Sequence, residues 1–177
     1  ETHDKLKVDK KRLQDCFSAR KIPVKRVGLS ASFMCVLLYR YSHWLFEKDW
    51  NLSARFLWQI NMFFTGADIS PMSNIDEGLL VIHPVAVTIV GNAGKNLTVE
   101  GLGGLGGGLS MDNIGAGPGL PLLGHNVTLT RGAMVLGPVR VGDRVHIGPG
   151  CTITRDVSEG LSILPHEFRV RNNPEKE

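Results

Sequence analysis

The chain has 177 residues, of which 42% are hydrophobic and 21% charged, a composition typical of one globular domain and not of a disordered chain. Its net charge of +3 is weak, and no basic stripe interleaved with aromatic residues argues for nucleic-acid binding. Cys16, Cys35 and Cys151 have the spacing of neither a disulfide scaffold nor a zinc site, which predicts a reduced, cytoplasmic setting and no metal.

Residues 1–25 carry a cluster of basic side chains and are predicted to be a mobile, solvated segment. The cluster consists of Lys5, Lys7, Lys10, Lys11 and Arg12.

Residues 26–66 are predicted to form two amphipathic helices, because apolar residues recur three and four positions apart. Asn51 or Ser53 is the expected cap of the second helix. Such apolar stripes favour contact with a core or another subunit. A helix lying on a membrane is the alternative, which nothing else in the sequence indicates. The apolar stretch at 27–39 is shorter than the ~20 residues that a bilayer span needs.

A period of six residues runs through the rest of the chain. Neither a helix nor an alternating strand has this period, whereas a parallel β-helix of hexapeptides does, with three hexapeptides in each coil. The recurring aliphatic residues are therefore predicted to stack inside a narrow prism. They are Ile69, Ile75, Val81, Val87, Ala93 and Val99, and then Leu123, Leu129, Val135, Val141, Ile147 and Ile153.

The predicted fold class is mainly β, a parallel β-helix preceded by a small α-helical segment. The β-helix covers residues 67–165 and is interrupted by a glycine-rich loop at 101–120. The loop is either a flexible excursion or bare backbone past which a ligand can thread. The repeat fades after Gly160, and residues 166–177 are predicted to be a tail.

One histidine, His83, interrupts the apolar run "LLVIHPVAV" at 79–87. The ordinary explanation is a core histidine with a satisfied hydrogen bond. However, His83 is the third residue of its hexapeptide, two positions after the inward Val81, and the third position is not an interior site. An imidazole on the outer wall has a pKa suited to taking a proton from a hydroxyl group near neutral pH.

Three stretches carry a resemblance to a known family: "ADISP" at 67–71, "EGLLVIHP" at 77–84 and "GLGGLGGG" at 101–108. Together with the preceding helices, they resemble the serine acetyltransferase branch of the hexapeptide acyltransferases over residues 40–165. The resemblance implies that the β-helix is left-handed. It also implies a homotrimer or a dimer of trimers, with acetyl-coenzyme A lying between neighbouring prisms as the acyl donor.

The resemblance also implies the site residues. His83 matches the catalytic base, and Asp68, fifteen residues earlier, matches the aspartate that orients it. The candidate residues for acetyl-coenzyme A are Gly103, Gly104, Ala133, His146 and Pro165, and those for the acceptor are Leu120, Pro121, Asp112 and Asn113. Backbone N–H groups of the glycine run are candidates for stabilising the oxyanion.

Departures from the family pattern bear on the acceptor. Ile82 stands where the serine enzymes have an aspartate, and Gly119 and Leu120 stand where they have an arginine and a histidine. A free amino acid needs partners for both of its charges. We therefore expect an acetyl-coenzyme A-dependent O-acetyltransferase acting on a sugar or polysaccharide precursor. Serine acetylation in cysteine biosynthesis is the alternative, and a non-catalytic hexapeptide scaffold is a second one.

Overall fold

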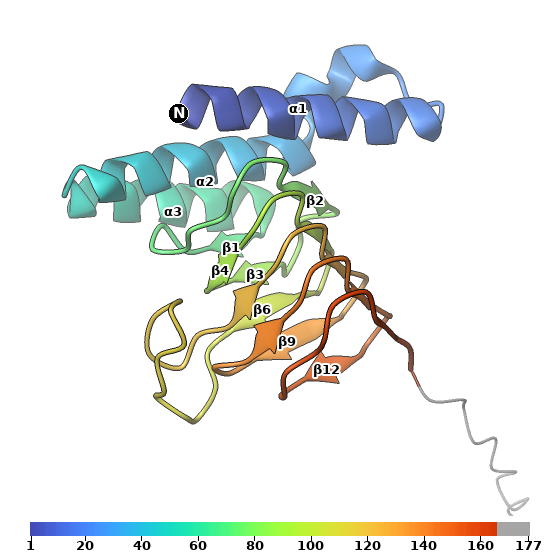
Figure 1. Ribbon diagram of the computed structural model, residues 1–177. Helices are drawn as coiled ribbons and strands as arrows, with labels where there is room; N and C mark the ends of the chain where they lie inside the picture. The colour runs from blue at the N-terminus through green and yellow to red at the C-terminus, as the bar shows by residue number, and fades with distance from the viewer. Residues whose placement is uncertain (166–177) are drawn as a thin grey trace, which may run out of the picture.

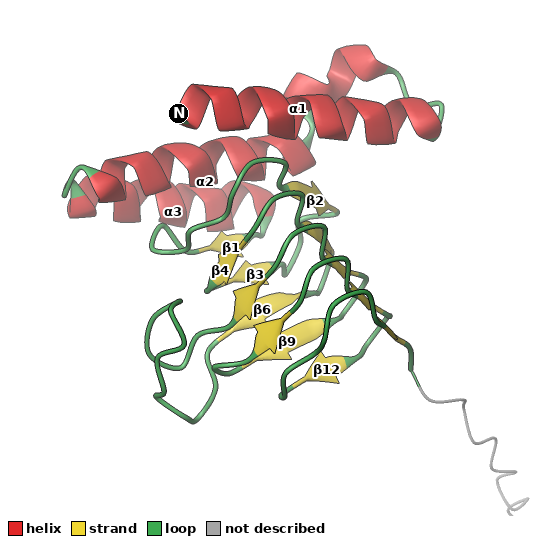
Figure 2. Ribbon diagram, viewed as in Figure 1, coloured by secondary structure: helices red, strands yellow, loops and turns green. Residues whose placement is uncertain are grey.

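The computed structural model describes residues 1–165, apart from the side chains of residues 24–26. Helical elements occupy most of the chain from Thr2 to Thr65, and short strands wind through the rest (Figures 1 and 2). The helical elements are α1 (Thr2–Ala19), the 3-10 helix η1 (Val24–Leu29), α2 (Ala31–Glu47) and α3 (Asn51–Thr65). The tail expected at 166–177 lies outside the described residues.

The strands form three parallel sheets, and successive strands along the chain pass from one sheet to the next, as in a β-helix. We call the sheets walls A, B and C. Wall A consists of β1 (Asp68–Ile69), β3 (Thr88–Ile89), β6 (Gly104–Gly106), β9 (Met134–Leu136) and β12 (Thr152–Ile153). Wall B consists of β4 (Asn92–Ala93), β7 (Leu122–Leu123) and β10 (Arg140–Val141). Wall C consists of β2 (Leu80–Ile82), β5 (Thr98–Glu100), β8 (Thr128–Leu129), β11 (His146–Ile147) and β13 (Ser162–Ile163).

The predicted aliphatic stack forms the core, with one exception. On wall C, Val81, Val99 and Leu129 pair in register and are fully buried. On wall A, however, Ile69 pairs with Ile89 and not with a residue at 87. Val87 is buried two residues before this position. The expected stacking role of Val87 is therefore wrong, because the corner before it contains two more residues than the repeat allows.

Residues 1–25 differ from the mobile segment expected of them. Residues 2–19 form α1, which buries Leu6, Leu13 and the carboxylate of Asp9 against the rest of the molecule. The basic side chains lie mostly on the exposed face, but Arg12 turns inward and donates to the carbonyl oxygens of Gly78 and Leu97. The basic residues suggested a solvated segment, but one of them, Arg12, anchors α1 to the first coils of the β-helix.

The helices cover the open upper edge of the β-helix, where backbone groups would otherwise lack partners. Asp9 accepts hydrogen bonds from the amides of Gly78 and Leu79 at 2.7 and 2.8 Å. Arg40 binds Asp9 through Nε at 2.9 Å and donates to the Ile75 carbonyl. Burial raises the pKa of Asp9, and the Arg40 guanidinium opposes this rise.

The α2–α3 pair begins with a side-chain cap and ends with a left-handed residue. Ser30 caps α2 by accepting from the Phe33 amide at 3.2 Å, and Gly66 ends α3 at φ +74°. Helix α3 begins at Asn51, and its cap is Trp50, without a side-chain hydrogen bond, in place of the expected Asn51 or Ser53.

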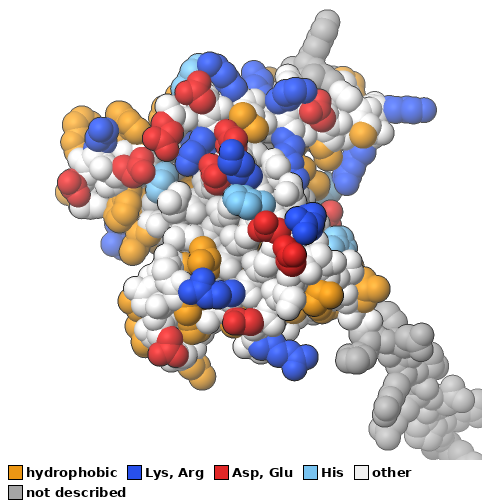
Figure 3. All heavy atoms as spheres, viewed as in Figure 1, with side chains coloured by type: hydrophobic (Ala, Val, Ile, Leu, Met, Phe, Trp, Pro, Cys, Tyr) orange, Lys and Arg blue, Asp and Glu red, His pale blue; other side chains and the backbone are white. Residues whose placement is uncertain are grey.

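Several large apolar side chains remain exposed around the far end of the α2–α3 hairpin, which extends beyond the prism (Figures 1 and 3). Trp50, Leu52 and Phe56 are among them. No helix within the described residues is long and apolar enough to cross a membrane.

Candidate active site

His83 lies on an enlarged corner between walls C and A. The inward residues Val81 and Ile89 flank this corner and are eight positions apart, whereas Val99 and Leu105, one coil below, are six apart. Leu129 and Val135 in the next coil are also six apart. The corner therefore contains two additional residues, and His83 and Pro84 follow directly after the last residue of β2.

The conformation of His83 argues against a core histidine. Its side chain is exposed, and its backbone is left-handed at φ +54°. This region is uncommon for residues other than glycine, and the following proline makes it less favourable still. The same left-handed conformation recurs at corner residues of other coils, namely Leu102, Asn126 and Arg144, so it is a feature of the turns and does not by itself mark a functional site. The exposure and the insertion favour the catalytic interpretation of His83.

Asp68 is held by a residue that the sequence did not suggest. The indole Nε1 of Trp58, in α3, donates to Asp68 Oδ1 at 2.8 Å. The described residues form no hydrogen bond to Oδ2, and none between Asp68 and His83. Asp68 pairs with Thr88, five residues after His83. The indole therefore fixes one oxygen and leaves the other available at the enlarged corner. The sequence offered one indication of this contact: Trp58 has an indole N–H donor and lies on the helix that leads into β1.

The glycines assigned to the coenzyme have structural reasons to be glycine. A Cβ at Gly104 would collide with the Thr88 carbonyl oxygen, and one at Gly103 would lie 2.9 Å from the Ala133 oxygen. The amides of Gly103 and Gly104 donate to the carbonyls of Glu100 and Ala133 at 3.0 and 2.9 Å. These two N–H groups are therefore occupied within the coil and do not provide an oxyanion hole. Ala133 itself is fully buried.

The remaining coenzyme candidates lie lower on the prism. His146 is a half-buried residue of β11 on wall C, paired with Thr128 and Ser162. Pro165 is exposed, and its Cδ lies 3.1 Å from where a Cβ on Gly148 would be. The structure thus gathers Gly103, Gly104 and Ala133 near the His83 corner, with His146 and Pro165 several coils away from it.

The acceptor candidates are on a different corner, between walls A and B. Asn113 Oδ1 accepts from the amides of Gly115 and Gly117, and Asp112 Oδ2 accepts from the Ser110 hydroxyl at 2.7 Å. Both polar groups therefore help to fold the loop itself. Leu120 is half-buried and Pro121 is buried at the loop's return to β7. Figure 1 shows the loop projecting from the side of the prism opposite to β2, so one chain does not bring these residues to His83.

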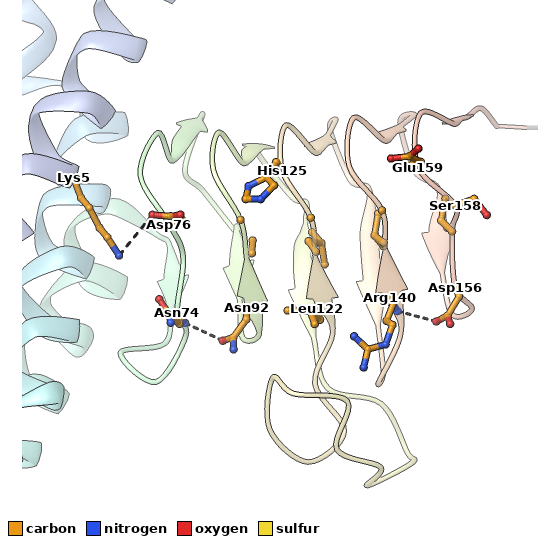
Figure 4. Close-up of a pocket in the computed structure, with 17 residues that line it drawn as sticks. Lys5, Asn74, Asp76, Asn92, Leu122, His125, Arg140, Asp156, Ser158 and Glu159 are labelled. Carbon is orange, nitrogen blue, oxygen red and sulfur yellow. Dashed lines mark hydrogen bonds and ion pairs between the residues drawn. The ribbon is translucent and has the colours of Figure 1, made fainter. Parts of the chain in front are cut away.

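A groove of about 800 Å³ runs along wall B, and none of these candidate residues lines it (Figure 4). Three glycines, Gly94, Gly124 and Gly142, lie along it, and coil contacts require them: a Cβ at Gly142 would lie 2.6 Å from the Glu159 amide. Charges of both signs line the groove, including the Lys5–Asp76 pair at 3.9 Å. Within residues 1–165 no group of three or more His, Cys, Asp or Glu side chains could hold a metal ion.

Comparisons with known proteins bear on the family. Residues 121–155 match the model of the bacterial transferase hexapeptide (six repeats). A serine acetyltransferase of Helicobacter pylori strain J99 is 34% identical over 133 residues, which cover 73% of this chain and 74% of that protein. One of Synechococcus elongatus is 28% identical over 155 residues, and the match covers 84% of this chain but 62% of the relative. The chain thus spans less than two thirds of the length of the Synechococcus protein.

Solved structures of serine acetyltransferases also have a similar fold. A solved structure titled as a serine acetyltransferase in complex with CoA superposes with a TM-score of 0.80 at 19% identity, over 93% of this chain and 66% of that one. At this identity the likeness shows the shared fold alone.

The expected sugar acceptor and its link to polysaccharide biosynthesis are contradicted by these relatives, which are named serine acetyltransferases. The apolar residue at position 82 has a different explanation, because Ile82 packs against a cluster that includes Leu13 of α1 and Val27 of η1. An identity of 34% along 74% of the Helicobacter protein establishes the relationship. The chain belongs to the serine acetyltransferase family of hexapeptide-repeat transferases, which are acetyl-coenzyme A-dependent O-acetyltransferases.

Proposed function

We propose that this chain transfers the acetyl group of acetyl-coenzyme A to the hydroxyl of L-serine, with His83 as the general base. The observation that carries the proposal is the exposed His83 on a corner with two inserted residues. A non-catalytic scaffold has no need for such a corner. The relatives named serine acetyltransferases support serine as the acceptor.

The reaction follows from the position of the imidazole. A neutral ring nitrogen of His83 takes the hydroxyl proton as the serine oxygen attacks the thioester carbonyl carbon. The carbon–sulfur bond then breaks, and the imidazolium returns the proton to the departing thiolate. Asp68 Oδ2 is suited to accept from the other ring nitrogen, because Trp58 already holds Oδ1. The thioester is already activated, so no covalent enzyme intermediate is needed.

We further propose that the active unit is a trimer of left-handed prisms. The part of the loop that carries Asp112, Asn113 and Leu120 lies on a different corner of one chain from His83, so a site that uses both requires a neighbouring copy. Wall A is suited to face that neighbour, because Asp68 is the sole charged residue among its outward side chains in the described structure. The other outward side chains on wall A include Thr88, Val90, Met134 and Leu136.

The proposal is tested by following free thiol from acetyl-coenzyme A with L-serine as acceptor. The expected result is thiol release that depends on serine, with O-acetyl-L-serine identified by mass spectrometry. Thiol release with no acetylated serine would contradict the proposal, as would the absence of any release from a folded protein.

A further inference from the structure

The proposed substrate carries a charge for which the site described so far offers no partner. Serine has an α-ammonium group joined to its hydroxyl through two carbon atoms, so an anion that binds it must lie close to His83. Leaving such a charge unpaired in a site is costly. The following inference rests on the proposed function and concerns how that site recognises its acceptor.

The residue directly before His83 cannot supply the anion. Ile82 is apolar, and it packs against the cluster formed by Leu13, Val27 and Leu80 beneath α1 and η1. Asp68 is the other nearby carboxylate, but its Oδ1 is bound to Trp58 and its role is to orient the imidazole. A different acidic side chain is therefore needed on the same face.

Glu100 occupies the position directly below Ile82. The two residues are register partners in β2 and β5, and neighbouring strands lie about 4.8 Å apart. Val99 points inward and is fully buried, so its neighbour Glu100 points outward from wall C in the same row as Ile82. Ile82 and Glu100 are therefore one full coil of the repeat apart.

The carboxylate of Glu100 is held in place but not neutralised. Its Oε2 accepts from the backbone amide of Arg131 at 3.2 Å. Within the described part of the chain Glu100 forms no ion pair, whereas Glu77 and Glu159 are paired with Lys95 and Arg144. The described residues form no hydrogen bond to its Oε1, so the second oxygen is available to a ligand.

The residue that lies against His83 from the coil below has no side chain. Gly101 follows Glu100, and its amide donates to the Ile82 carbonyl at 2.8 Å. A Cβ at Gly101 would lie 2.5 Å from the His83 carbonyl oxygen. Beneath His83 the chain is therefore bare backbone at Gly101, next to the Glu100 carboxylate.

We propose that Glu100 binds the α-ammonium of serine and so determines the specificity of this site for an amino-acid acceptor. An ammonium–carboxylate hydrogen bond is of the strong, charge-assisted kind. It holds the serine with its hydroxyl toward His83, one strand above. The carboxylate that position 82 lacks is thus supplied from the next coil, where the helices do not cover it.

The test compares the wild-type protein with Glu100→Gln, which keeps the size of the side chain and removes its charge. We expect the KM for L-serine to rise roughly 10–100-fold, the usual range for losing a hydrogen bond to a charged group. The KM for acetyl-coenzyme A should stay within about twofold of the wild-type value. Glu100→Asp, which keeps the charge, should recover part of the loss, and Glu159→Gln is the matched control on another corner.

A second acceptor distinguishes recognition of the ammonium group by Glu100 from a purely structural role of this residue. 3-Hydroxypropanoate has the hydroxyl and carboxylate of serine but no ammonium group. The wild type should prefer serine strongly, and Glu100→Gln should reduce this preference by the same factor as it lowers kcat/KM for serine. Equal losses with both acceptors would instead give Glu100 a structural role and overturn the inference.

Failure of this inference is distinct from failure of the proposed function. If the wild type acetylates serine and Glu100→Gln does so with unchanged KM, the inference is wrong and the proposed function stands. If the folded wild type does not acetylate serine, the proposed function fails and the role of Glu100 fails with it.

Discussion

The indole of Trp58 donates a hydrogen bond to Asp68 across 2.8 Å, and so links helix α3 to the first strand of the β-helix beside the catalytic corner. The contact fixes one carboxylate oxygen and the direction in which the other points. We therefore expect Trp58→Phe to act on catalysis through Asp68. Its kcat should fall by less than that of Asp68→Asn, with little change in the KM for either substrate. Steady-state kinetics of Trp58→Phe, Asp68→Asn and the double variant measure this.

In the double variant the two losses should not add, because both changes remove the same orientation of the imidazole. Fully additive losses would show that Trp58 acts on catalysis by another route.

Replacing His83 should lower kcat by ~10²–10⁴-fold, which is the usual contribution of a positioned general base. Asn is the preferred replacement, because it tolerates the left-handed backbone that His83 adopts at φ +54°. The side chain is exposed, so the thermal unfolding midpoint should hardly change. Near-wild-type turnover of His83→Asn would remove His83 from the mechanism.

The buried ion pair between Arg40 and Asp9 should be essential for attaching the helices. Both side chains are about 1% exposed, and Arg40 Nε lies 2.9 Å from Asp9 Oδ2. Arg40→Met leaves the Asp9 carboxylate buried without its cation, which typically costs about 3–5 kcal/mol. Urea unfolding followed by far-ultraviolet circular dichroism measures this loss.

Lys11→Met on the exposed face of α1 is the control, because its pair with Asp15 is surface-exposed and worth little. Equal stability of the Arg40 and Lys11 variants would contradict the assigned role of the buried pair.

Stability should decline above pH 9 because two acidic groups on α2 are buried in their neutral forms. Burial raises the pKa of the Cys35 thiol from 9.0 to about 12 and that of the Tyr39 hydroxyl from 10.0 to about 12. In the unfolded chain both groups ionise earlier, so their contribution is complete below pH 9 and is lost as the pH rises toward 12. Each group adds a slope of about 1.4 kcal/mol per pH unit within its own window.

Denaturant unfolding between pH 8 and pH 11 measures this slope. Cys35→Ala should make the loss of stability shallower from pH 9 upward. The loss that remains should come from ionisation of Tyr39. If Cys35→Ala lost stability with rising pH as steeply as the wild type, ionisation of Cys35 would not contribute to the decline.

The assembly should depend on wall A. Leu136→Arg places a charge on this wall and should convert the trimer to smaller species in analytical ultracentrifugation at micromolar concentration. Ser158→Arg places the same charge beside the groove on wall B and should leave the trimer intact. A wild-type monomer at this concentration would contradict the proposed trimer.

The sequence alone determined the coiled part of the fold. A six-residue period makes each inward side chain stack on its counterpart one coil away, so the pattern specifies walls, core and coil length together. It also pointed to His83, because an imidazole at an outward position has no packing reason to be there. The coil period could likewise have paired Ile82 with Glu100, since residues one coil apart become neighbours.

Tertiary structure decided what the repeat does not encode. The two inserted residues at the His83 corner moved the stacking role from Val87 to Ile89, and local apolar content gave no sign of the shift. The basic residues of α1 suggested a solvated segment, yet Arg12 and Asp9 anchor that helix to backbone groups of Gly78, far along the chain. The apolar Ile82 suggested an acceptor other than serine, but its side chain is apolar because it packs against the helices above it. A single residue's chemistry does not reveal such contacts, because the partners come from distant parts of the chain and are set only when the helices dock.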